Sequence, residues 1–325
     1  MNQQEPLIVG VDGGGTSSKY VAVKYDGTVI AVLEGKGLNY NSIGMETARK
    51  RLFTSINALL NKAGASDYEV ACVGLSALDG KADEQTLQGF CGAIIPYNKL
   101  RLNSDVHAAL IGSQAGEPNV MVISGTGSMV AGLDTGGRIH ISGGWGYRLN
   151  DPASAYGVSI EGLKAALMHA EETGEQTILY KESLDYFGVT NSRSLVAALY
   201  VDSLDVVEVA GFGQRVIQCA RRGDKVATDI IEKQYTFLAE QTAQVMKQCP
   251  KTFSLYGGMF EHNEWIRSYF IIQLQKIIPY AEYVEMKLPP SLGTVIAFLK
   301  EQNKLTNDII ERMRKTMETF GNECT

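Results

Sequence analysis

The sequence has few cysteines and histidines, and none of them stands at the spacing that a metal or redox site requires. It contains five cysteines and four histidines among 325 residues. No two cysteines form the C-x-x-C pair that zinc, redox and iron–sulfur sites often use. No histidine lies at ligand spacing from a second histidine, a cysteine or a carboxylate. We therefore expect buried free thiols and no transition metal held by protein ligands.

Long apolar runs and an excess of basic residues are also missing. The longest apolar runs, such as residues 119–124 and 271–278, fall far below the roughly 20 residues that cross a bilayer. Residues 1–6 are polar and carry neither a basic region nor a small-residue cleavage site. The net charge of −6 disfavours sequence-independent binding to nucleic acid, which relies on clusters of lysine and arginine. The sequence therefore predicts a cytoplasmic protein with no membrane partner and no nucleic-acid partner.

The composition that remains is typical of a globular protein with two domains. Hydrophobic residues make up 45% of the chain and charged residues 20%, and 325 residues exceed what one core usually serves. The spacing of apolar residues predicts a three-strand meander followed by alternating helices and strands. The predicted strands are residues 7–11, 20–25, 28–33, 70–75 and 100–103, and the predicted helices are residues 45–62, 83–95 and 106–114. Such an order implies an α/β sheet covered by helices.

The same pattern then starts again, which predicts an internal duplication. Residues 123–128 align with residues 11–16, strand on strand and glycine turn on glycine turn. The second copy has predicted strands at residues 120–124, 129–133, 138–142, 252–256 and 283–287, and predicted helices at residues 154–170, 192–201, 206–215, 224–248, 265–277 and 292–300. We expect an N-terminal domain of residues 1–117, a linker near residues 115–119, and a nucleotide-binding C-terminal domain of residues 118–325 with a helical insertion.

The first glycine turn has the residues of a phosphate-binding loop. It consists of Asp12, Gly13, Gly14, Gly15 and Thr16. Glycine lets backbone N–H groups approach an anion closely and gives a free choice of φ, and the Asp at the strand end is placed to orient the waters of a Mg²⁺ ion. The chain holds no G-x-x-x-x-G-K-[ST] string, and residues 19–25 continue as a strand where a dinucleotide fold needs a helix. A plain glycine-rich hairpin is the alternative.

The second glycine turn is a near copy of the first without its carboxylate. It consists of Gly125, Thr126, Gly127 and Ser128. Ser124 aligns with Asp12, so only the first turn offers an Asp to a Mg²⁺ ion. A hairpin is again the alternative, but two matched turns are less expected by chance than one.

Asp105 follows a predicted strand and opens a predicted helix. A helix cap is one explanation, because Ser and Asp are preferred at this position. The other is a general base that accepts the proton of a substrate hydroxyl during phosphoryl transfer. Asp is a weak base, with a solution pKa of about 3.9, but a loose transition state depends more on positioning. Both interpretations stay open from the spacing alone.

With these turns and Asp105, the sequence resembles the N-acetylglucosamine kinase family, in the BadF/BadG-type ATPase branch of the sugar kinase, hsp70 and actin superfamily. The resemblance spans nearly the whole chain and is strongest at residues 11–16, 123–128 and 143–146. It implies an α/β fold of two duplicated ribonuclease H-like (actin-like ATPase) domains with an interdomain cleft, and ATP and Mg²⁺ as cofactors. By the same resemblance both glycine turns bind the phosphates, Asp105 is the catalytic base, and Gly257 and Gly258 lie against the adenosine.

The resemblance also implies a set of sugar contacts. Its members are Asn39, Asp105, Thr126, Gly144, Trp145, Asp151 and Ala155. Sugar hydroxyls need paired donors and acceptors, which Asn39 and Asp151 supply, and a Trp ring can stack on a pyranose face. A turn Asn, a helix-cap Asp and a core Trp are the alternatives for these three residues.

The chain departs from the family at two places near these contacts. The family often has a Glu where this chain has Pro152, within the stretch of residues 150–154, and an aromatic residue where this chain has Asn41. A bulkier or acidic amino sugar such as N-acetylmuramic acid therefore stays open as the acceptor. Arg148 would then be a partner for its carboxylate.

The sequence predicts an ATP-dependent kinase that phosphorylates the 6-hydroxyl of an amino sugar. N-acetylglucosamine is the first candidate, ahead of N-acetylmuramic acid and glucosamine, and a homodimer stays open. One alternative is an ATPase activator of an iron–sulfur reductase or dehydratase. Such activators bridge a cluster with cysteines near the second turn, where this chain has Val122, Ile123 and Ser124. The other alternative is a non-catalytic sugar sensor, which would bind sugar without releasing ADP.

Overall fold

Two units of the chain fold around separate cores. The computed structural model describes residues 6–92, 94–149, 151–200 and 204–321. The first unit is Met1–Glu117 with Glu285–Thr325, and the second is Pro118–Val284. Residues after 284 were predicted in the C-terminal domain, whereas they belong to the first unit. Residues 1–5, residue 93 of the predicted helix 83–95, Asn150, Val201 and Cys324 are not among the described residues.

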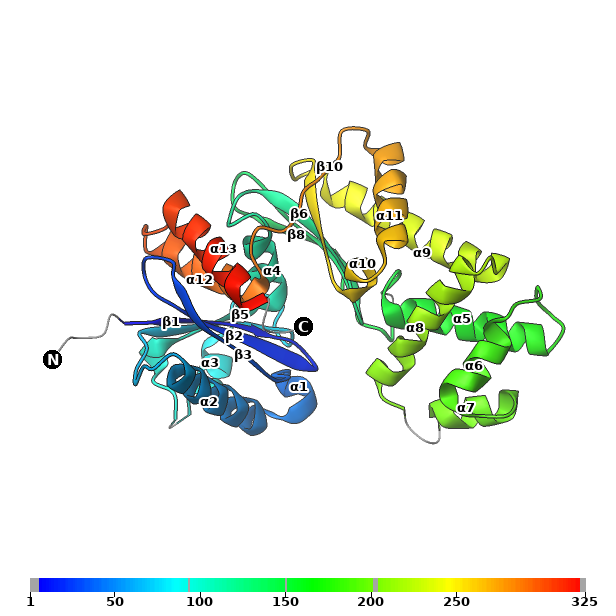
Figure 1. Cartoon of the computed structure of the whole chain (residues 1–325), viewed down its shortest axis with the longest axis horizontal. Coiled ribbons are helices and arrows are strands. Elements are labelled where there is room, and N and C mark those ends of the chain that lie inside the picture. The colour runs from blue at the N-terminus through cyan, green and yellow to red at the C-terminus, as the bar shows by residue number, and fades with distance from the viewer. Residues whose placement is uncertain (1–5, 93, 150, 201–203, 322–325) are drawn as a thin grey trace. The chain divides into compact units, whose positions relative to one another are not determined.

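The first unit is built on a five-stranded mixed sheet (Figure 1). Its strands are β1 (Ile8–Gly13), β2 (Ser17–Val23), β3 (Val29–Lys36), β4 (Val70–Leu75) and β5 (Leu100–Ser104). They lie in the order β3-β2-β1-β4-β5. The first three form the predicted antiparallel meander, whereas β4 and β5 run parallel to β1. Every residue of β4 is buried, as its unbroken apolar sequence predicts.

Six helices of the described residues belong to this unit. They are α1 (Tyr40–Ile43), α2 (Met45–Lys62), α3 (Glu84–Cys91), α4 (Asp105–Ser113), α12 (Pro290–Glu301) and α13 (Asn307–Gly321), with a 3₁₀ turn, η1, at Tyr97–Lys99. α2, α3, α4 and α12 lie where the apolar period predicts helices, whereas α1 and α13 were not predicted. Along α2, Leu52, Ile56 and Leu59 lie three or four residues apart and are all buried. The predicted helix at residues 83–95 ends early, at Cys91, because Gly92 takes a φ of 49° and closes it.

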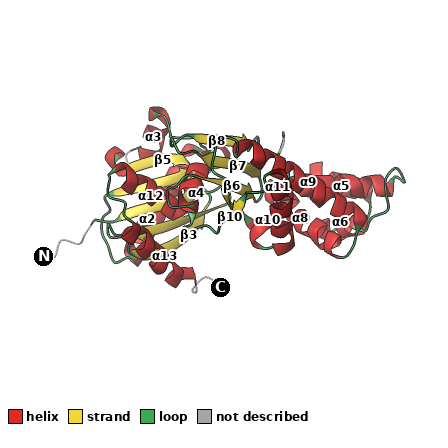
Figure 2. Ribbon diagram, turned by 90° about the horizontal axis from the view of Figure 1, so that it is seen from above, coloured by secondary structure: helices red, strands yellow, loops and turns green. Residues whose placement is uncertain are grey.

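Two glycines explain why residues after 284 belong to the first unit. A Cβ atom on Gly293 of α12 would lie 1.9 Å from the carbonyl oxygen of Ala108 in α4, and a Cβ atom on Gly10 of β1 would lie 2.2 Å from that of Ser291. α12 therefore packs directly on α4 and on the sheet (Figure 2). Its apolar sequence predicts burial but does not say against which sheet.

The second unit repeats the topology of the first. Its strands are β6 (Asn119–Ser124), β7 (Ser128–Leu133), β8 (Ile139–Gly143), β9 (Thr252–Tyr256) and β10 (Glu282–Tyr283), in the order β10-β9-β6-β7-β8. β6, β7 and β8 form an antiparallel meander, and β9 and β10 run parallel to β6. The predicted duplication is confirmed, although β10 is shorter than the strand predicted at residues 283–287.

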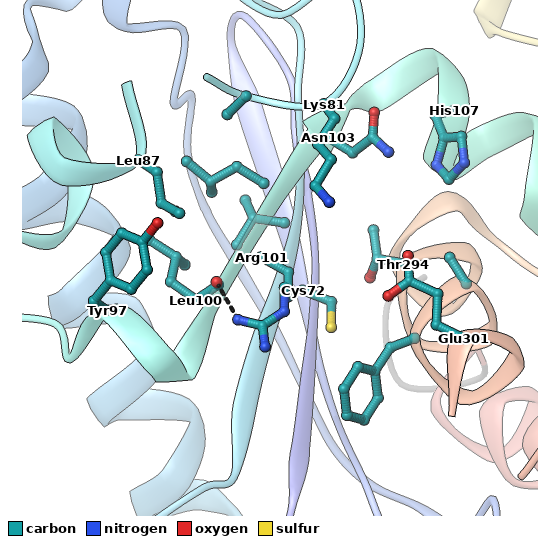
Figure 3. Close-up of a pocket in the computed structure, with 15 residues that line it drawn as sticks. Cys72, Lys81, Leu87, Tyr97, Leu100, Arg101, Asn103, His107, Thr294 and Glu301 are labelled. Carbon is teal, nitrogen blue, oxygen red and sulfur yellow. Dashed lines mark hydrogen bonds between the residues drawn. The ribbon is translucent and has the colours of Figure 1, made fainter. Parts of the chain in front are cut away.

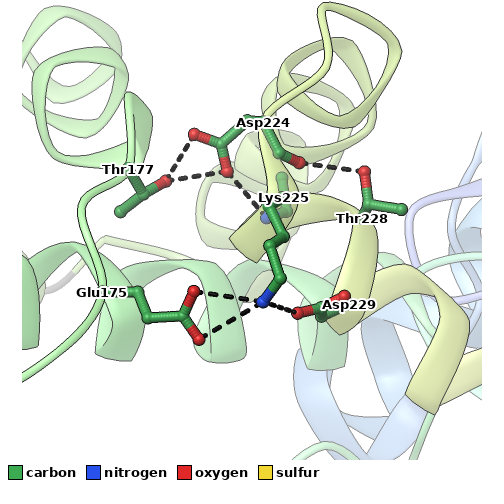
Figure 4. Close-up of polar contacts among 7 residues, drawn as sticks. Glu175, Thr177, Asp224, Lys225, Thr228 and Asp229 are labelled. Atoms are coloured by element: carbon green, nitrogen blue, oxygen red, sulfur yellow. Dashed lines mark hydrogen bonds and ion pairs between the residues drawn. The ribbon is translucent and has the colours of Figure 1, made fainter.

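Five helices form the predicted insertion between β8 and β9, and two more follow β9. They are α5 (Ala155–Ala170), α6 (Leu179–Phe187), α7 (Ser192–Tyr200), α8 (Val206–Arg221) and α9 (Lys225–Val245), then α10 (Gly258–Glu261) and α11 (Glu264–Ile277). Asp224 caps α9 through Ala227 N at 2.8 Å, and it also accepts hydrogen bonds from Thr177 Oγ1 at 2.9 Å and Ile178 N at 2.8 Å (Figure 4). This one carboxylate ties the start of α6 to α9.

Candidate active site

Three parallel strands of the first unit end at one edge of their sheet, and both predicted carboxylates lie there. β1, β4 and β5 are neighbours, with Asp12 opposite Gly74 and Gly74 opposite Asn103. Asp12 is the last residue but one of β1, and Asp105 begins α4 directly after β5. Gly74 allows this approach, because a Cβ atom there would lie 2.8 Å from Ala108 Cβ and 3.2 Å from Asp105 Cα. The fold thus brings Asp12 and Asp105 to neighbouring strand ends.

Both carboxyl groups ionise less readily than they would in water. Burial raises the pKa of Asp12 to about 6; the negative charge of Asp105 adds to this rise, and Lys19 opposes it. Burial also raises the pKa of Asp105, against backbone N–H groups that include Val106 N, which donates to Asp105 Oδ1 at 2.7 Å. A carboxylate with a raised pKa accepts a proton more readily than a free one.

Ser104, and not Asp105, caps α4. His107 N donates to Ser104 Oγ at 3.1 Å, and Ser104 has the extended backbone of a capping residue. The capping role that the spacing allowed for Asp105 is thus filled by its neighbour. Asp105 becomes the first residue of the helix, where its charge interacts favourably with the helix dipole.

The first glycine turn packs against the chain that follows β3. Leu38 N donates to Gly14 O at 3.0 Å, and Gly37 N donates to Thr16 O at 2.9 Å. A Cβ atom on Gly37 would lie 2.0 Å from Gly15 O, so only a glycine fits at position 37. These contacts fix the turn from one side.

Steric space, and not φ, explains the glycines of the first turn. None of Gly13, Gly14 and Gly15 has a positive φ, so the free choice of φ invoked from the sequence is not what these positions need. Gly13 is enclosed, because a Cβ atom there would lie 2.8 Å from Gly74 O. Gly15 is open, with no atom within 4 Å of the place where its Cβ would stand. The missing side chain at Gly15 leaves the backbone accessible to a ligand.

Asn39 lies at the same strand edge. Its Nδ2 donates to Ser76 Oγ at 3.4 Å, and Ser76 N donates to Gly13 O at 3.1 Å. Its Oδ1 accepts from Asn41 N at 3.1 Å and caps α1. The turn-Asn interpretation is therefore correct for Oδ1, while the amide nitrogen points to the end of β4.

In the second unit, hydrogen bonds fasten the second glycine turn to the stretch that leads into α5. Ala155 N donates to Gly125 O at 2.8 Å, and Ser128 Oγ donates to Pro152 O at 2.5 Å. Thr126 lies between these two contacts and is exposed. A Cβ atom on Gly125 would meet nothing within 4 Å, as at Gly15.

Ser124 adds a buried contact below this turn. Its Oγ donates to Ala153 O at 2.5 Å and lies 3.0 Å from Tyr235 Oη. Ala153 has a φ of 61°, a conformation that costs a non-glycine residue free energy, and its N–H is held by Gln234 Oε1 at 2.5 Å. Ser124, which aligns with Asp12, therefore holds the backbone at Ala153 in place.

Asp151 lies against both the second turn and the glycine-rich segment at residues 143–146. Its Oδ1 accepts from Gly146 N at 3.1 Å, and its Oδ2 is 3.0 Å from the place where a Cβ atom on Gly127 would stand. Burial raises the pKa of Asp151, while backbone N–H groups of Gly146, Ser128 and Trp145 act in the opposite direction. The structure therefore brings three predicted site residues, Gly127, Trp145 and Asp151, into one cluster.

The segment at residues 143–146 is shaped by positive φ angles and presents Trp145 to solvent. Gly143, Gly144 and Gly146 have φ values of 82°, 72° and 88°, which only glycine adopts without strain. Trp145 is 69% exposed, so it is not the core residue that one interpretation allowed. Trp145 lies next in space to the half-buried Asp151, and its exposed indole ring offers a face on which a sugar ring can stack.

Arg148, just after this segment, contacts its neighbour Tyr147. Its Nε donates to Tyr147 Oη at 3.1 Å, and its guanidinium lies 5.7 Å from the centre of the Tyr147 ring. The Tyr147 ring packs edge-on against the ring of Tyr156 in α5, and the two ring centres are 4.9 Å apart. These contacts restrict an otherwise long and exposed side chain.

Gly257 packs against the second glycine turn. It has a φ of 106°, and a Cβ atom there would lie 2.5 Å from Ser124 O and 3.0 Å from Gly125 N. Gly258 begins α10 and has more room, with His262 Cδ2 at 3.6 Å as its nearest contact. The second turn and the predicted adenosine-binding glycines are therefore in direct contact.

Two further residues, Gly37 and Gly74, shape the strand edge of the first unit and were not among the predicted site residues. Gly74 interrupts the buried strand of residues 70–75, and an isolated glycine in a strand often marks a close approach of two backbones. Gly37 follows the strand that ends the meander. Both signals were present in the sequence.

In the described part of the chain, no group of three or more His, Cys, Asp or Glu side chains is arranged to hold a metal ion. Cys72, Cys91, Cys219 and Cys249 are free and buried. No helix within the described ranges is both long enough and apolar enough to span a bilayer.

Comparisons with known proteins agree with these observations. The chain matches the model of the BadF/BadG/BcrA/BcrD ATPase family over residues 9–285. It is 27% identical to an N-acetylmuramic acid/N-acetylglucosamine kinase of Clostridium acetobutylicum over 296 residues, covering 89% of this chain and 97% of the relative. It is 25% identical to an N-acetyl-D-glucosamine kinase of Dictyostelium discoideum over 317 residues, covering 91% and 98%.

Solved structures share the fold. A protein from Chromobacterium violaceum, described provisionally as an N-acetylglucosamine kinase, aligns with a TM-score of 0.75 and 22% identity over 90% of this chain and 98% of its own. A ROK family glucokinase from Streptomyces griseus aligns with a TM-score of 0.56 and 16% identity over 90% and 97%. These likenesses confirm the predicted fold class, an α/β protein with two actin-like ATPase domains.

Proposed function

Because the chain belongs to the BadF/BadG/BcrA/BcrD ATPase family, which implies the use of ATP, we propose that it transfers the γ-phosphoryl group of ATP to the 6-hydroxyl of an amino sugar. N-acetylglucosamine is the first candidate acceptor. The names of the relatives from Clostridium acetobutylicum and Dictyostelium discoideum support this substrate class. The observation that carries the proposal is the meeting of Asp105 and Asp12 at one strand edge, with an open glycine turn beside them.

Asp105 acts as the general base. Its position at the first residue of α4, with Ser104 taking the capping role, leaves the carboxylate for a substrate hydroxyl. Its raised pKa increases its affinity for the proton that the sugar hydroxyl releases. A loose phosphoryl-transfer transition state depends mainly on such positioning, and the proton moves late.

The glycine turns hold the phosphates, and Gly257 and Gly258 lie against the adenosine. The residues assigned to the nucleotide are Gly13, Gly14, Gly15, Thr16, Gly125, Thr126, Gly127, Gly257 and Gly258. Support comes from Gly15 and Gly125, whose missing side chains leave open space beside the backbone. Backbone N–H groups suit this role in a chain with a net charge of −6.

Asp12 is placed to orient the waters of a Mg²⁺ ion. The donor set fits, because Asp12 offers a hard carboxylate oxygen and Asp105 supplies a second negative charge nearby. Since the described residues hold no closed cluster of metal ligands, Asp12 would act together with water and phosphate oxygens. When bound, Mg²⁺ supplies positive charge that neutralises the transferring phosphoryl group.

The acceptor sugar is assigned to the contacts that the family resemblance implies. The assigned contacts are Asn39, Asp105, Thr126, Gly144, Trp145, Asp151 and Ala155. Asp151 and Asn39 offer an acceptor and a donor to sugar hydroxyls, and the exposed ring of Trp145 offers a face for stacking. The amide nitrogen of Asn39 makes only a long 3.4 Å contact, which a sugar hydroxyl can replace.

An acidic amino sugar is a second candidate acceptor, and Arg148 is the observation that favours it. Arg148 follows Trp145 by three residues, and its side chain donates to Tyr147 Oη and lies over the Tyr147 ring. A guanidinium pairs well with a carboxylate, such as the lactyl group of N-acetylmuramic acid. The relative from Clostridium acetobutylicum is named for both sugars.

Coupling of ATP hydrolysis to an iron–sulfur enzyme is less compatible with this chain. The residues before the second turn are Val122, Ile123 and Ser124, and none is a cluster ligand. All four described cysteines are buried.

A coupled assay of ADP release tests the proposal. The acceptors are N-acetylglucosamine, N-acetylmuramic acid, glucosamine, glucose and glycerol, each with and without Mg²⁺, and ³¹P NMR of the product identifies the phosphorylated hydroxyl. We expect the highest kcat/KM with an N-acetylated amino sugar and a 6-phosphate as the product. ADP release that is independent of sugar would indicate an ATPase, and sugar binding without ADP release would indicate a sensor; either result contradicts the proposal.

A further inference from the structure

A cavity of about 330 Å³ lies in the first unit beside the edge strand β5, apart from the residues assigned to ATP and sugar (Figure 3). The polar side chains that line it include Lys81, Arg101, Asn103, His107, Thr294 and Glu301. Small-molecule pockets measure roughly 300–1,000 Å³, so this cavity suits a small ligand.

Apolar side chains form the rest of the wall. Leu87 comes from α3, Leu100 from β5 and Phe298 from α12. Leu100 is fully buried and Phe298 is 7% exposed, so both are fixed by packing. A ligand that covers this wall needs an apolar part of its own.

The cavity carries charges of both signs that do not pair with each other. Lys81 and Arg101 extend into it from the loop before α3 and from β5, and Glu301 lies on the α12 side (Figure 3). Within the described part of the chain, none of these three side chains forms an ion pair. Arg101 donates only through Nη1, to Leu100 O at 2.9 Å and Asn98 O at 3.3 Å, so its other nitrogens stay available.

His107 adds a hydrogen-bonding group and not a charge. Burial lowers the pKa of His107 below its usual range, and Glu301 acts in the opposite direction. At neutral pH its imidazole is therefore uncharged. The cavity thus presents two cations towards one side and one anion towards the other.

We propose that this cavity binds a small zwitterion with an apolar side chain, of the α-amino acid class. Its carboxylate lies against Arg101 and Lys81, and its ammonium group lies against Glu301. Its side chain covers the wall that includes Leu87 and Phe298. A bidentate arginine contact and an ion pair at the other end fix both orientation and charge.

Occupancy of the cavity is expected to change phosphoryl transfer. Asn103 and His107 line the cavity and stand two residues before and two residues after Asp105. A ligand that fixes these two residues acts on the positioning of the carboxylate. This consequence rests on the proposed function, whereas the binding itself does not.

Calorimetry of the full chain with L-leucine and L-phenylalanine, without ATP or sugar, tests the binding. We expect saturable binding of at least one of them, and at least a tenfold loss of affinity for N-acetyl-leucine, which lacks the ammonium group, and for leucinamide, which lacks the carboxylate. Lys81→Ala and Glu301→Gln should each weaken binding several-fold. Lys62→Ala, which removes an exposed lysine of the same unit outside the cavity, should leave binding unchanged.

The analogues keep the test decisive even where a variant fails to fold. No binding of either amino acid, or equal binding of leucine and its two analogues, would overturn the proposal. Glucosamine 6-phosphate and inorganic phosphate serve as further probes. If they bind in the cavity and the amino acids do not, the cavity is an anion site and the proposal is wrong. Because no nucleotide is present, failure here leaves the kinase proposal untouched.

Discussion

The two glycine turns occupy equivalent places in duplicated sheets but differ in what surrounds them. The first follows Asp12 and lies at the strand edge where Asp105 begins α4. The second follows Ser124, whose hydroxyl is used to hold Ala153 O. The same position therefore has two different chemistries. In the first unit it is Asp12, a carboxylate with a raised pKa, and in the second it is Ser124, whose hydroxyl supports the backbone. The duplication kept the turn in both copies and the acid in only one.

The largest expected effect separates these two positions. Asp12→Asn should lower kcat by on the order of 10² or more, because it removes the charge that orients the metal ion, while the fold persists. Ser124→Ala should instead lower the free energy of unfolding by about 1–2 kcal/mol, because it removes a buried hydrogen bond. Steady-state kinetics and urea denaturation of both variants provide the measurement. An equal loss of kcat in both variants would contradict the proposed difference in role between Asp12 and Ser124.

A smaller effect concerns the glycine that supports the second turn. Gly257→Ala should destabilise the protein by about 1–3 kcal/mol, because it forces a side chain into a backbone conformation reserved for glycine and against Ser124 O. Gly258→Ala is the matched control, because a Cβ atom there would lie at an ordinary 3.6 Å from His262 Cδ2. The free energy of unfolding of this variant should hardly change. If Gly258 lies against the adenosine, its variant should raise the KM for ATP. Similar unfolding curves for both variants would contradict this account of the turn.

The pH dependence of stability should reveal the carboxylate that only the first turn has. Asp12 has a pKa of about 6 when folded and 3.8 as its ordinary value, so the folded chain holds an extra proton between these values. Stability should therefore fall as the pH rises from about 4 to about 6. Asn cannot ionise, so at pH 7.5 the free energy of unfolding of Asp12→Asn should exceed that of the wild type by on the order of 1–3 kcal/mol. Below pH 3.8, where Asp12 is protonated in both states, the two proteins should be equally stable. Parallel pH profiles for the two proteins would show that Asp12 ionises normally.

The smallest effect tests the acceptor side of the second unit. Arg148→Ala should lower kcat/KM for N-acetylmuramic acid about three- to tenfold, the scale of an exposed ion pair, and leave N-acetylglucosamine unchanged. Arg138→Ala, which removes an exposed arginine from the β7–β8 turn, is the control and should affect neither sugar. An equal change for both sugars would remove Arg148 from any role in recognising a carboxylate.

The sequence predicted the fold better than the packing partners. Apolar spacing located α2 and β4 without error, and the matched turns revealed the duplication. Apolar spacing did not show that α12 packs in the first unit, because that depends on Gly10 and Gly293, which lie close to carbonyl oxygens of distant segments. α6 was missed between two predicted helices, and α13 beyond the last one.

For the site, residue types were easier to predict than their surroundings. Spacing could not decide whether Asp105 caps its helix; the contact between His107 N and Ser104 Oγ does. Spacing also could not show that Trp145 is exposed, because that follows from the φ angles of the glycines around it. The roles of these residues in binding and catalysis stay predictions.

Turnover of Asp105→Asn tests the central claim most directly. Asn preserves the shape of the side chain and can still accept from Val106 N, so the fold and the binding of sugar should persist. If Asp105 is the general base, kcat for the best amino sugar falls by on the order of 10² or more while the unfolding temperature stays within the error of the wild-type value. A folded variant with wild-type kcat would contradict the account.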